Sequence, residues 1–381
     1  MRNHFADSGH PTTGLRIQPI FQRVIAAHRI LWAIPVSLWI VCAACTMISG
    51  VRSSDSPDTD TTSSVFSWQF DSIGTFRSVI HDLSILDNQT FFGVGLIRRD
   101  SLIDNLIEWD GVYRLKSIPL TAGFASLKAL TAHSRNNLMI ASDVTLLRLT
   151  STTVEELASF LPSADAPGFG SINRIWSADP NTLFLVGQNG YTILYQAGEW
   201  RALPGSNRPP LLDIHGNGNT IVTVGYSGQN RGLIMSYTGS SWQIVNLPFL
   251  PREANPAGVW VSSDSVYCVT QLGLAVFKPE RRSGRLIPLA ICHPGGSALS
   301  AIRGNHARDF MIADSRGGIS HYNGRRWRHF DSPLPAALQP HFILTAFDFR
   351  DDRVVAGGYH RIHKYALILR GRRTHAEQRQ F

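Results

Sequence analysis

The sequence lacks the short motifs that mark the common catalytic and metal centres. Its 381 residues contain no nucleophile elbow, no P-loop and no cluster of zinc ligands. The fourteen histidines show no metal-ligand spacing: His360 and His363 lie in a stretch of β character, where residues i and i+3 point to opposite faces. We therefore predict no metal site and no cofactor, and no motif assigns a catalytic residue.

Net charge is missing from the central part of the chain, although the whole protein has a formal charge of +8. Residues 1–45 contribute +3 and residues 361–381 contribute +5, so that residues 46–360 sum to zero. A groove for a phosphate backbone needs basic residues clustered on the folded body. We therefore expect no nucleic-acid partner.

Charged residues are also absent from residues 30–51, a run of 22 mostly apolar residues behind Arg16, Arg23 and Arg29. A basic segment followed by an apolar one is typical of an export signal, and the positive charges stay inside while the rest is exported. We assign residues 1–51 to a signal or anchor segment. The protein is then expected to be extracytoplasmic, periplasmic or at the cell surface, and to meet the membrane through its N-terminus.

Two forms of this segment remain open. The stretch "CAAC" ends in Cys45 and is similar to a bacterial lipobox, in which Cys45 would be lipidated, but Cys42 stands where leucine is usual. Alternatively, the run is long enough to span a bilayer as an uncleaved signal anchor. Residues 52–64 contain no apolar side chain, so we predict a flexible linker over residues 52–66.

Only two cysteines lie beyond the signal segment. Cys268 falls in an expected strand and Cys292 in an expected loop. A disulfide between them would be compatible with an oxidising compartment. The sequence leaves open whether the two cysteines pair.

The chain does contain a repeat of about 43 residues. Its clearest mark is an aromatic residue after a glycine-containing turn, as in "AGEWRAL" (197–203) and "TGSSWQIV" (238–245), where an outer strand is expected to begin. These aromatic positions are Trp68, Tyr113, Trp200, Trp242 and Trp327, with members missing near residues 154–157 and 285–286.

An apolar position upstream marks the first strand of each unit. It is occupied by Leu83, Leu130, Ile175, Ile214, Val259, Ile302 and Phe347. Seven copies of a four-stranded unit are typical of a β-propeller, whose sheets bury both faces only when the ring closes. We predict an all-β fold, a seven-bladed β-propeller over residues 67–370, followed by a basic tail over residues 371–381.

The seventh copy lacks a fourth strand, and a spare one stands at the other end of the chain. Residues 67–74, "SWQFDSIG", have the tryptophan-led form of an outer strand but precede the first copy. We predict that this N-terminal strand completes the seventh blade and closes the ring.

Polar residues flank the apolar position of the first strands, which line the central channel of a propeller. The candidates for a shared cavity are Asp82, Arg174, Asp213, His215, Arg303 and Asp348. Converging opposite charges could bind a polar ligand or shift a pKa. The more common alternative is that these residues bond to one another and to the loops between blades. We expect Trp176 and Trp260 to pack between blades.

At this point the sequence resembles bacterial exported propellers. The units "LFLVGQNGYTILYQAGEW" and "YCVTQLGLAVFKPERRSG" resemble the repeat of two-component-regulator-type sensory propellers. The stretch "IHDLSILDNQTFFGVG" is similar to the first blade of propeller lipoproteins. The resemblance covers about residues 67–370; it implies a propeller and export, and says little about function.

Three functions follow as hypotheses. The first is a membrane-tethered, non-enzymatic module that binds a protein or glycan partner. The second is an exported glycan-active enzyme, a hydrolase or lyase, with Asp82, Asp213 and Asp348 as acid and base. The third is a sensory domain for a small ligand in the channel.

Overall fold

The structure is a computed structural model that describes residues 65–120, 126–160, 171–190, 192–196, 198–203, 209–227, 231–263, 265–294 and 297–374. The predicted anchor segment, with Cys45, and the predicted linker up to residue 64 lie outside these residues. Within the described ranges, no helix has the length and apolar character needed to cross a bilayer.

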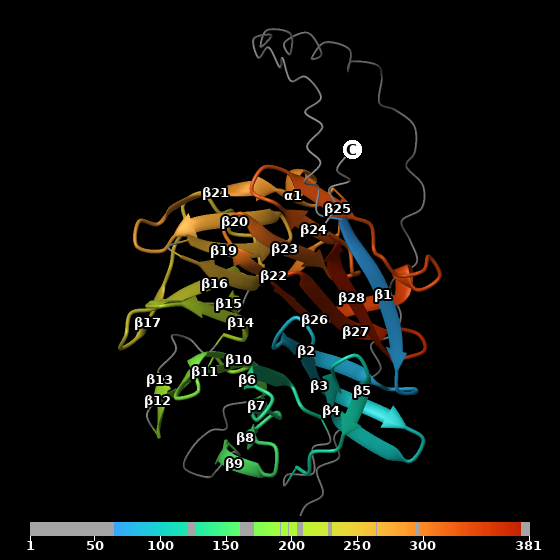
Figure 1. The fold of residues 1–381 in the computed structure, drawn as a ribbon. Coiled ribbons are helices and arrows are strands. Elements are labelled where there is room, and N and C mark those ends of the chain that lie inside the picture. Colours follow the sequence, from blue (N-terminus) through green and yellow to red (C-terminus); the bar gives the residue numbers. More distant parts are fainter. Residues whose placement is uncertain are drawn as a thin grey trace, which may run out of the picture. The chain divides into compact units, whose positions relative to one another are not determined.

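The described strands form seven four-stranded antiparallel sheets, the blades of a propeller (Figure 1). Blades one to three consist of β2 (Val79–Ile85), β3 (Phe91–Arg99), β4 (Leu102–Trp109) and β5 (Tyr113–Lys116); β6 (Ala129–Ser134), β7 (Asn137–Ala141), β8 (Thr145–Leu149) and β9 (Val154–Ser159); and β10 (Ile172–Asp179), β11 (Thr182–Gly187), β12 (Thr192–Gln196) and β13 (Glu199–Leu203). Blades four to six consist of β14 (Leu211–Asn217), β15 (Thr220–Ser227), β16 (Arg231–Tyr237) and β17 (Trp242–Ile244); β18 (Pro256–Ser262), β19 (Ser265–Thr270), β20 (Gly273–Lys278) and β21 (Ser283–Pro288); and β22 (Leu299–His306), β23 (Asp309–Asp314), β24 (Ile319–Tyr322) and β25 (Trp327–Phe330).

Blade seven joins the two ends of the described chain. It contains β26 (Phe342–Arg350), β27 (Arg353–His360), β28 (Ala366–Thr374) and, as its outer strand, β1 (Val65–Ile73). All nine residues of β1 pair with β28, from Val65 opposite Thr374 to Ile73 opposite Ala366. The predicted N-terminal closing strand is confirmed. It begins two residues before the predicted start, and β28 continues to Thr374, into the stretch assigned to a basic tail.

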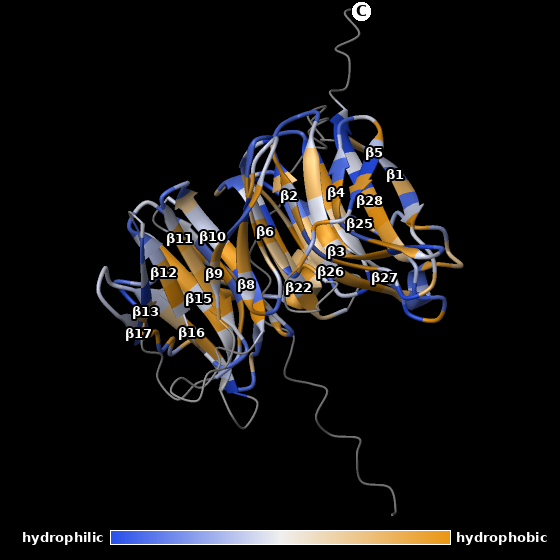
Figure 2. Ribbon diagram, turned by 90° about the horizontal axis from the view of Figure 1, so that it is seen from below, coloured by the Kyte–Doolittle hydropathy of each residue, from blue (hydrophilic) through white to orange (hydrophobic). Residues whose placement is uncertain are grey.

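The first strands form the inner wall of the ring. Each one contacts the first strand of the next blade, and β26 contacts β2, so that the ring is closed. The sheets pack face to face through apolar clusters, such as Ile80, Phe91 and Val355 between blades seven and one. Figure 2 shows hydrophobic residues concentrated along the strands and hydrophilic ones in the connecting turns.

A bulge recurs in the inner strand of six blades, just before the residue that precedes the apolar position. It lies in β2, β10, β14, β18, β22 and β26. A bulge re-aims the following side chain. The second strand comes close to the inner strand just before the bulge: a Cβ at Gly95 would collide with the carbonyl oxygen of Val79, and one at Gly225 with that of Pro210. This contact explains the small residues at the end of many second strands.

The recurring aromatic residue begins or lies near the start of an outer strand and packs on its own blade. Trp242 lies 5.4 Å from the ring of Tyr237, and Trp327 lies 5.1 Å from Tyr322 (centroid to centroid). Its role is therefore structural, since it covers the outer edge of the sheet.

The two cysteines beyond the signal segment do not form a disulfide. Both are free and buried. Cys268 belongs to the apolar cluster that blade five shares with blade four, whereas Cys292, in the short helix α1 (Leu289–Cys292), belongs to the cluster shared with blade six. The body of blade five separates the two thiols, and burial raises the pKa of both.

Candidate binding face and central channel

The inner strands bring most of the predicted channel residues to one cavity, where the first strands end and turn into the second strands. The cavity has a volume of about 470 Å³. Asp82, Arg174, His215, Arg303 and Asp348 line it. Asp213 lies deeper, with 5% of its surface exposed. We call this cavity the channel mouth.

Arg174 extends from blade three across the channel. Its guanidinium forms an ion pair with Asp82 of blade one at 2.8 Å and donates a hydrogen bond to the carbonyl oxygen of His81 at 3.2 Å. It also donates to the carbonyl oxygen of Thr345 in blade seven, at 3.2 Å. One side chain therefore connects three blades through the centre of the ring.

Arg303 makes the corresponding connection on the other side of the channel. It extends from blade six and binds both carboxylate oxygens of Asp213 in blade four, each at 3.2 Å. The same guanidinium donates to the carbonyl oxygen of Val259 in blade five, at 3.1 Å. A bidentate pair of this kind is stronger and more directional than a single contact.

The three channel aspartates also connect neighbouring inner strands. In each case a carboxylate oxygen accepts a backbone N–H from the next blade: Asp82 from Leu130 at 3.1 Å, Asp213 from Val259 at 3.0 Å, and Asp348 from Ile85 at 2.7 Å. Their acceptor capacity is thus largely used within the ring. This arrangement is the structural alternative that the sequence left open.

Burial and the two arginines set the protonation of the channel. Burial raises the pKa of Asp213, but the guanidiniums of Arg303 and Arg174 more than offset it, so that this pKa lies below its ordinary value. Burial raises the pKa of Asp82 and Asp348. Burial, reinforced by the Arg303 charge, lowers the pKa of His215 to about 3.

His215 is therefore neutral at physiological pH. Its Nδ1 accepts the N–H of Val261 at 3.1 Å, which leaves the hydrogen on Nε2. The imidazole can then donate one hydrogen bond, as part of the wall of the channel mouth.

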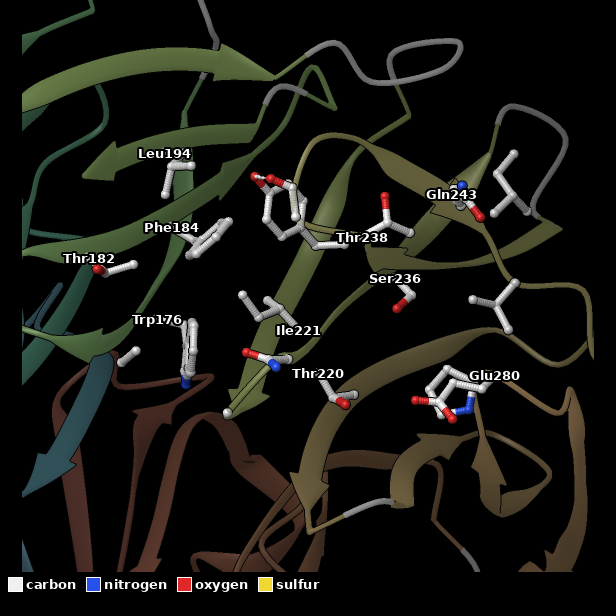
Figure 3. A pocket seen from close by; sticks show the side chains of 18 of the residues that line it. Trp176, Thr182, Phe184, Leu194, Thr220, Ile221, Ser236, Thr238, Gln243 and Glu280 are labelled. Carbon is white, nitrogen blue, oxygen red and sulfur yellow. Dashed lines mark hydrogen bonds between the residues drawn. The ribbon is translucent and has the colours of Figure 1, made fainter. Parts of the chain in front are cut away.

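A second and larger hollow lies beside the channel mouth, at the turns of blades three, four and five. Its volume is about 610 Å³. Figure 3 shows Trp176, Phe184 and Leu194 along one side and Gln243 and Glu280 on the other. We call it the outer pocket. The sequence did not predict it, because it depends on how the turns of three blades meet.

Trp176 belongs to both hollows. Its ring lies 5.9 Å from Phe184 and 6.4 Å from His215, so it packs within the structure, as expected, and also separates the two cavities. Trp260 is 3% exposed and packs 5.7 Å from Phe310 of blade six. The channel mouth and the outer pocket therefore open on the same face of the ring, on either side of Trp176. We call this face the mouth face.

A serine, a histidine and an aspartate also line up inside blade six. The Ser320 hydroxyl lies 2.9 Å from His293 Nδ1, and His293 Nε2 lies 3.0 Å from Asp314. In a serine hydrolase Nε2 contacts the serine and Nδ1 the aspartate, so the imidazole is reversed here. Ser320 and His293 are both fully buried, which keeps any substrate away from the hydroxyl. These hydrogen bonds attach His293, which follows α1, to Ser320 of β24.

No group of three or more potential metal ligands is present among the residues that the structure describes. Three histidines do come together at blade seven: His360 stacks 4.8 Å from His363 and lies 5.3 Å from His341. The expectation that His360 and His363 point to opposite faces was wrong, because β27 ends at His360 and His363 lies in the following turn. These are ring contacts, in which the nitrogens do not converge on a common point as metal ligands would.

Comparison with known proteins supports the fold. No family model matches the sequence, and no curated protein matches it. Among solved structures, the chain is similar to YCF48 bound to D1 peptide, with a TM-score of 0.60 at 14% identity, over 81% of this chain and 96% of that one. It is also similar to YCF48 from Cyanidioschyzon merolae (TM-score 0.56, 14% identity, 82% and 99% covered). The WD40 β-propeller domain of Doa1 gives a TM-score of 0.56 at 11% identity, with 80% and 96% covered. At these identities the likeness establishes a β-propeller and does not extend to function.

Proposed function

We propose that this propeller is a membrane-tethered, extracytoplasmic binding module that holds a partner protein through an extended segment laid along the mouth face. The observation that carries the proposal is the pair of cavities on that face, a polar channel mouth and a larger outer pocket, which are both lined by Trp176. Apolar side chains with a few polar groups are typical of recognition pockets. The structure of YCF48 bound to D1 peptide gives an example of a peptide bound by a protein of this fold.

The two hollows suit different parts of such a segment. An apolar side chain would fill the outer pocket against Trp176, Phe184 and Tyr237, with Gln243 and Glu280 available for hydrogen bonds. The neighbouring residues would cross the channel mouth, where the neutral His215 offers a donor. Aromatic walls give a large contact area at low entropic cost, which is why they dominate binding energy.

The channel carboxylates favour this function over the enzyme alternative. Asp82 and Asp213 are buried and form ion pairs with Arg174 and Arg303. Asp348 is half-buried, and its two carboxylate oxygens accept the backbone N–H groups of Ile85 and Phe349. A general acid or base must instead reach the substrate within hydrogen-bond distance. We infer that these three residues hold the ring, and expect no glycosidase or lyase activity.

The tether is the sequence-based part of the proposal. The charge-free run of residues 30–51 behind three arginines supports a lipidated Cys45 or an uncleaved anchor. Membrane fractionation with mass spectrometry of the N-terminus distinguishes the two. A full-length chain found in the cytoplasm would contradict both.

Site-specific photo-crosslinking in intact cells tests the binding face. A photoreactive residue in place of Gln243, in the outer pocket, should capture one partner reproducibly and crosslink to a single segment of it. The matched control is Gln271, in the turn between β19 and β20 on the opposite face of the ring. Equal capture from both positions, or none from Gln243, would overturn the proposal.

A further inference from the structure

Three arginines converge where blade seven packs against blade one. Arg353 of β27 lies directly opposite Arg372 of β28, and Ser67 of β1 lies opposite Arg372 on the other side. Arg370 stands two residues before Arg372, on the same face of the sheet. Like charges directly opposite one another on neighbouring strands destabilise a sheet. The arrangement therefore calls for a compensating negative charge.

The protein itself supplies only part of that charge. Asp71 forms an ion pair with Arg370 at 2.8 Å. In the described part of the chain, no carboxylate forms an ion pair with Arg353 or Arg372. Arg353 is only 8% exposed, and burial together with the charges of Arg372 and Arg370 lowers its pKa. Only the charge of Asp87 opposes that shift, and Arg372 is exposed to solvent, so that neither guanidinium is neutralised by an ion pair.

Two of the three arginines, Arg353 and Arg370, pack against an aromatic ring. The guanidinium carbons of Arg353 and Arg370 each lie 4.7 Å from the ring centroid of Trp109, which stacks on Phe91 at 5.2 Å. Arg353 also donates a hydrogen bond to the carbonyl oxygen of Asn88. Cation–π contacts of this kind fix the guanidiniums before a ligand arrives, which lowers the entropic cost of binding.

A cavity of about 240 Å³ opens between these groups. It is lined by Ser67, Gln69, Trp109, Arg353, Arg370, Gly371 and Arg372. A water molecule occupies roughly 30 Å³ in the liquid, so the space holds several waters or one tetrahedral anion. The Gln69 amide at its rim is a further hydrogen-bond donor, whereas the Ser67 hydroxyl donates to the carbonyl oxygen of Arg372 at 3.3 Å.

We propose that this cavity, which we call the seam site, binds a doubly charged oxyanion: free phosphate or sulfate, or the phosphate group of a small monoester. Planar guanidiniums match the oxygens of such groups in charge and geometry. The ligand would contact β1, β27 and β28 at once and so bind only the closed ring. Binding to the native state alone stabilises it by mass action. The seam site is separate from the mouth face and does not depend on the function proposed for that face.

Thermal unfolding of the full-length protein in a mild detergent tests the proposal. Phosphate and sulfate should raise the melting temperature saturably, compared with chloride at the same ionic strength. Arg353→Gln and Arg372→Gln should each weaken the apparent affinity for phosphate by about 10- to 100-fold, because a charge-assisted hydrogen bond is lost. Arg252→Gln, on the loop before β18, is the matched control and should leave the affinity unchanged.

Two further readouts separate binding from a structural role. Without oxyanion, Arg372→Gln should not lower the melting temperature, because it relieves the repulsion with Arg353. Glycerol phosphate that binds more tightly than inorganic phosphate would identify an ester as the ligand; equal affinity would identify the free ion. An equal response to phosphate and chloride, or an unchanged phosphate affinity in both arginine variants, would overturn the seam site.

Discussion

The inner and outer parts of the ring each hold a group of arginines, and the two groups differ in what neutralises them. In the channel, Arg174 and Arg303 contact Asp82 and Asp213, and every blade contributes an inner strand to the surrounding wall. At the seam, only Arg370 of the three arginines forms an ion pair within the described residues, with Asp71.

The comparison shows that similar side chains serve different purposes according to their surroundings. A compensated cluster spanning several blades stabilises the ring and has little capacity left for a ligand. In an uncompensated cluster, repulsion between like charges raises the free energy of the folded protein. Binding of an anion removes that repulsion and lowers the free energy again. The net balance of charge, more than the number of charged groups, distinguishes a structural from a binding cluster.

The largest effect is expected from removing the strand on which the seam is built. Deletion of residues 1–63 should leave a folded ring, because β1 starts at Val65. Deletion through residue 74 removes all nine pairs with β28 and exposes the edge of blade seven. We expect loss of the cooperative melting transition in the longer deletion, followed by circular dichroism. Equal melting temperatures for the two proteins would show that β1 does not close the ring.

The next effect should come from breaking the balance in the channel. Asp213→Asn leaves Arg303 and Arg174 without their shared carboxylate and should cost about 3–5 kcal/mol of unfolding free energy, measured by urea denaturation. Asp100→Asn, at an exposed turn with a φ of 51°, is the matched control and should change little.

The same variant predicts a change in pH dependence. The folded-state pKa of Asp213 is depressed, so its stabilisation is present above the unfolded value of about 3.9 and is lost as the pH falls through the folded value. Asp213→Asn should remove that part of the acid destabilisation. If the unfolding free energy of the variant falls as steeply at acid pH as that of the wild type, other carboxylates cause the acid destabilisation.

The smallest effect concerns the other face of β1. Trp68 is half-buried and packs 5.6 Å from Phe330 of blade six. Trp68→Ala should therefore cost about 2–3 kcal/mol, less than the 3–5 kcal/mol typical of a fully buried aromatic residue. Phe70→Ala, on the same face but 44% exposed, should cost clearly less. A larger loss for Phe70 than for Trp68 would show that Trp68 is not the main contact of the closing strand.

The blades and the closing strand could be predicted because their signals are local and repeated. An apolar inner position, a small residue after the second strand and an aromatic residue at the outer strand occur in most copies. The N-terminal strand was recognisable because Trp68 matches a position that the seventh copy lacks. The recurrent bulge was not predictable, because a small residue such as Gly95 on the neighbouring strand does not by itself indicate a bulge.

The partners of the channel residues and the seam site depend on long-range register. The sequence indicated that Arg174 and Arg303 face the channel, but which aspartate each reaches depends on the width of the ring. Arg370 and Arg372 were assigned to the end of the propeller and its tail, although their two-residue spacing already predicts a common face of a strand. That Arg353 lies opposite Arg372 follows only from the pairing of β27 with β28.

The closing strand also sets the order of events during folding. Ser67 and Arg372 are 305 residues apart, so β1 finds its partner only after β28 (Ala366–Thr374) has been synthesised. Contacts between such distant residues carry a large loop-closure cost and are associated with slow folding. Until then, Phe66, Trp68 and Phe70 remain unpaired on an edge strand that invites aggregation. If the chain is exported, as proposed above, a chaperone or a nearby membrane surface would protect the unpaired strand during this interval.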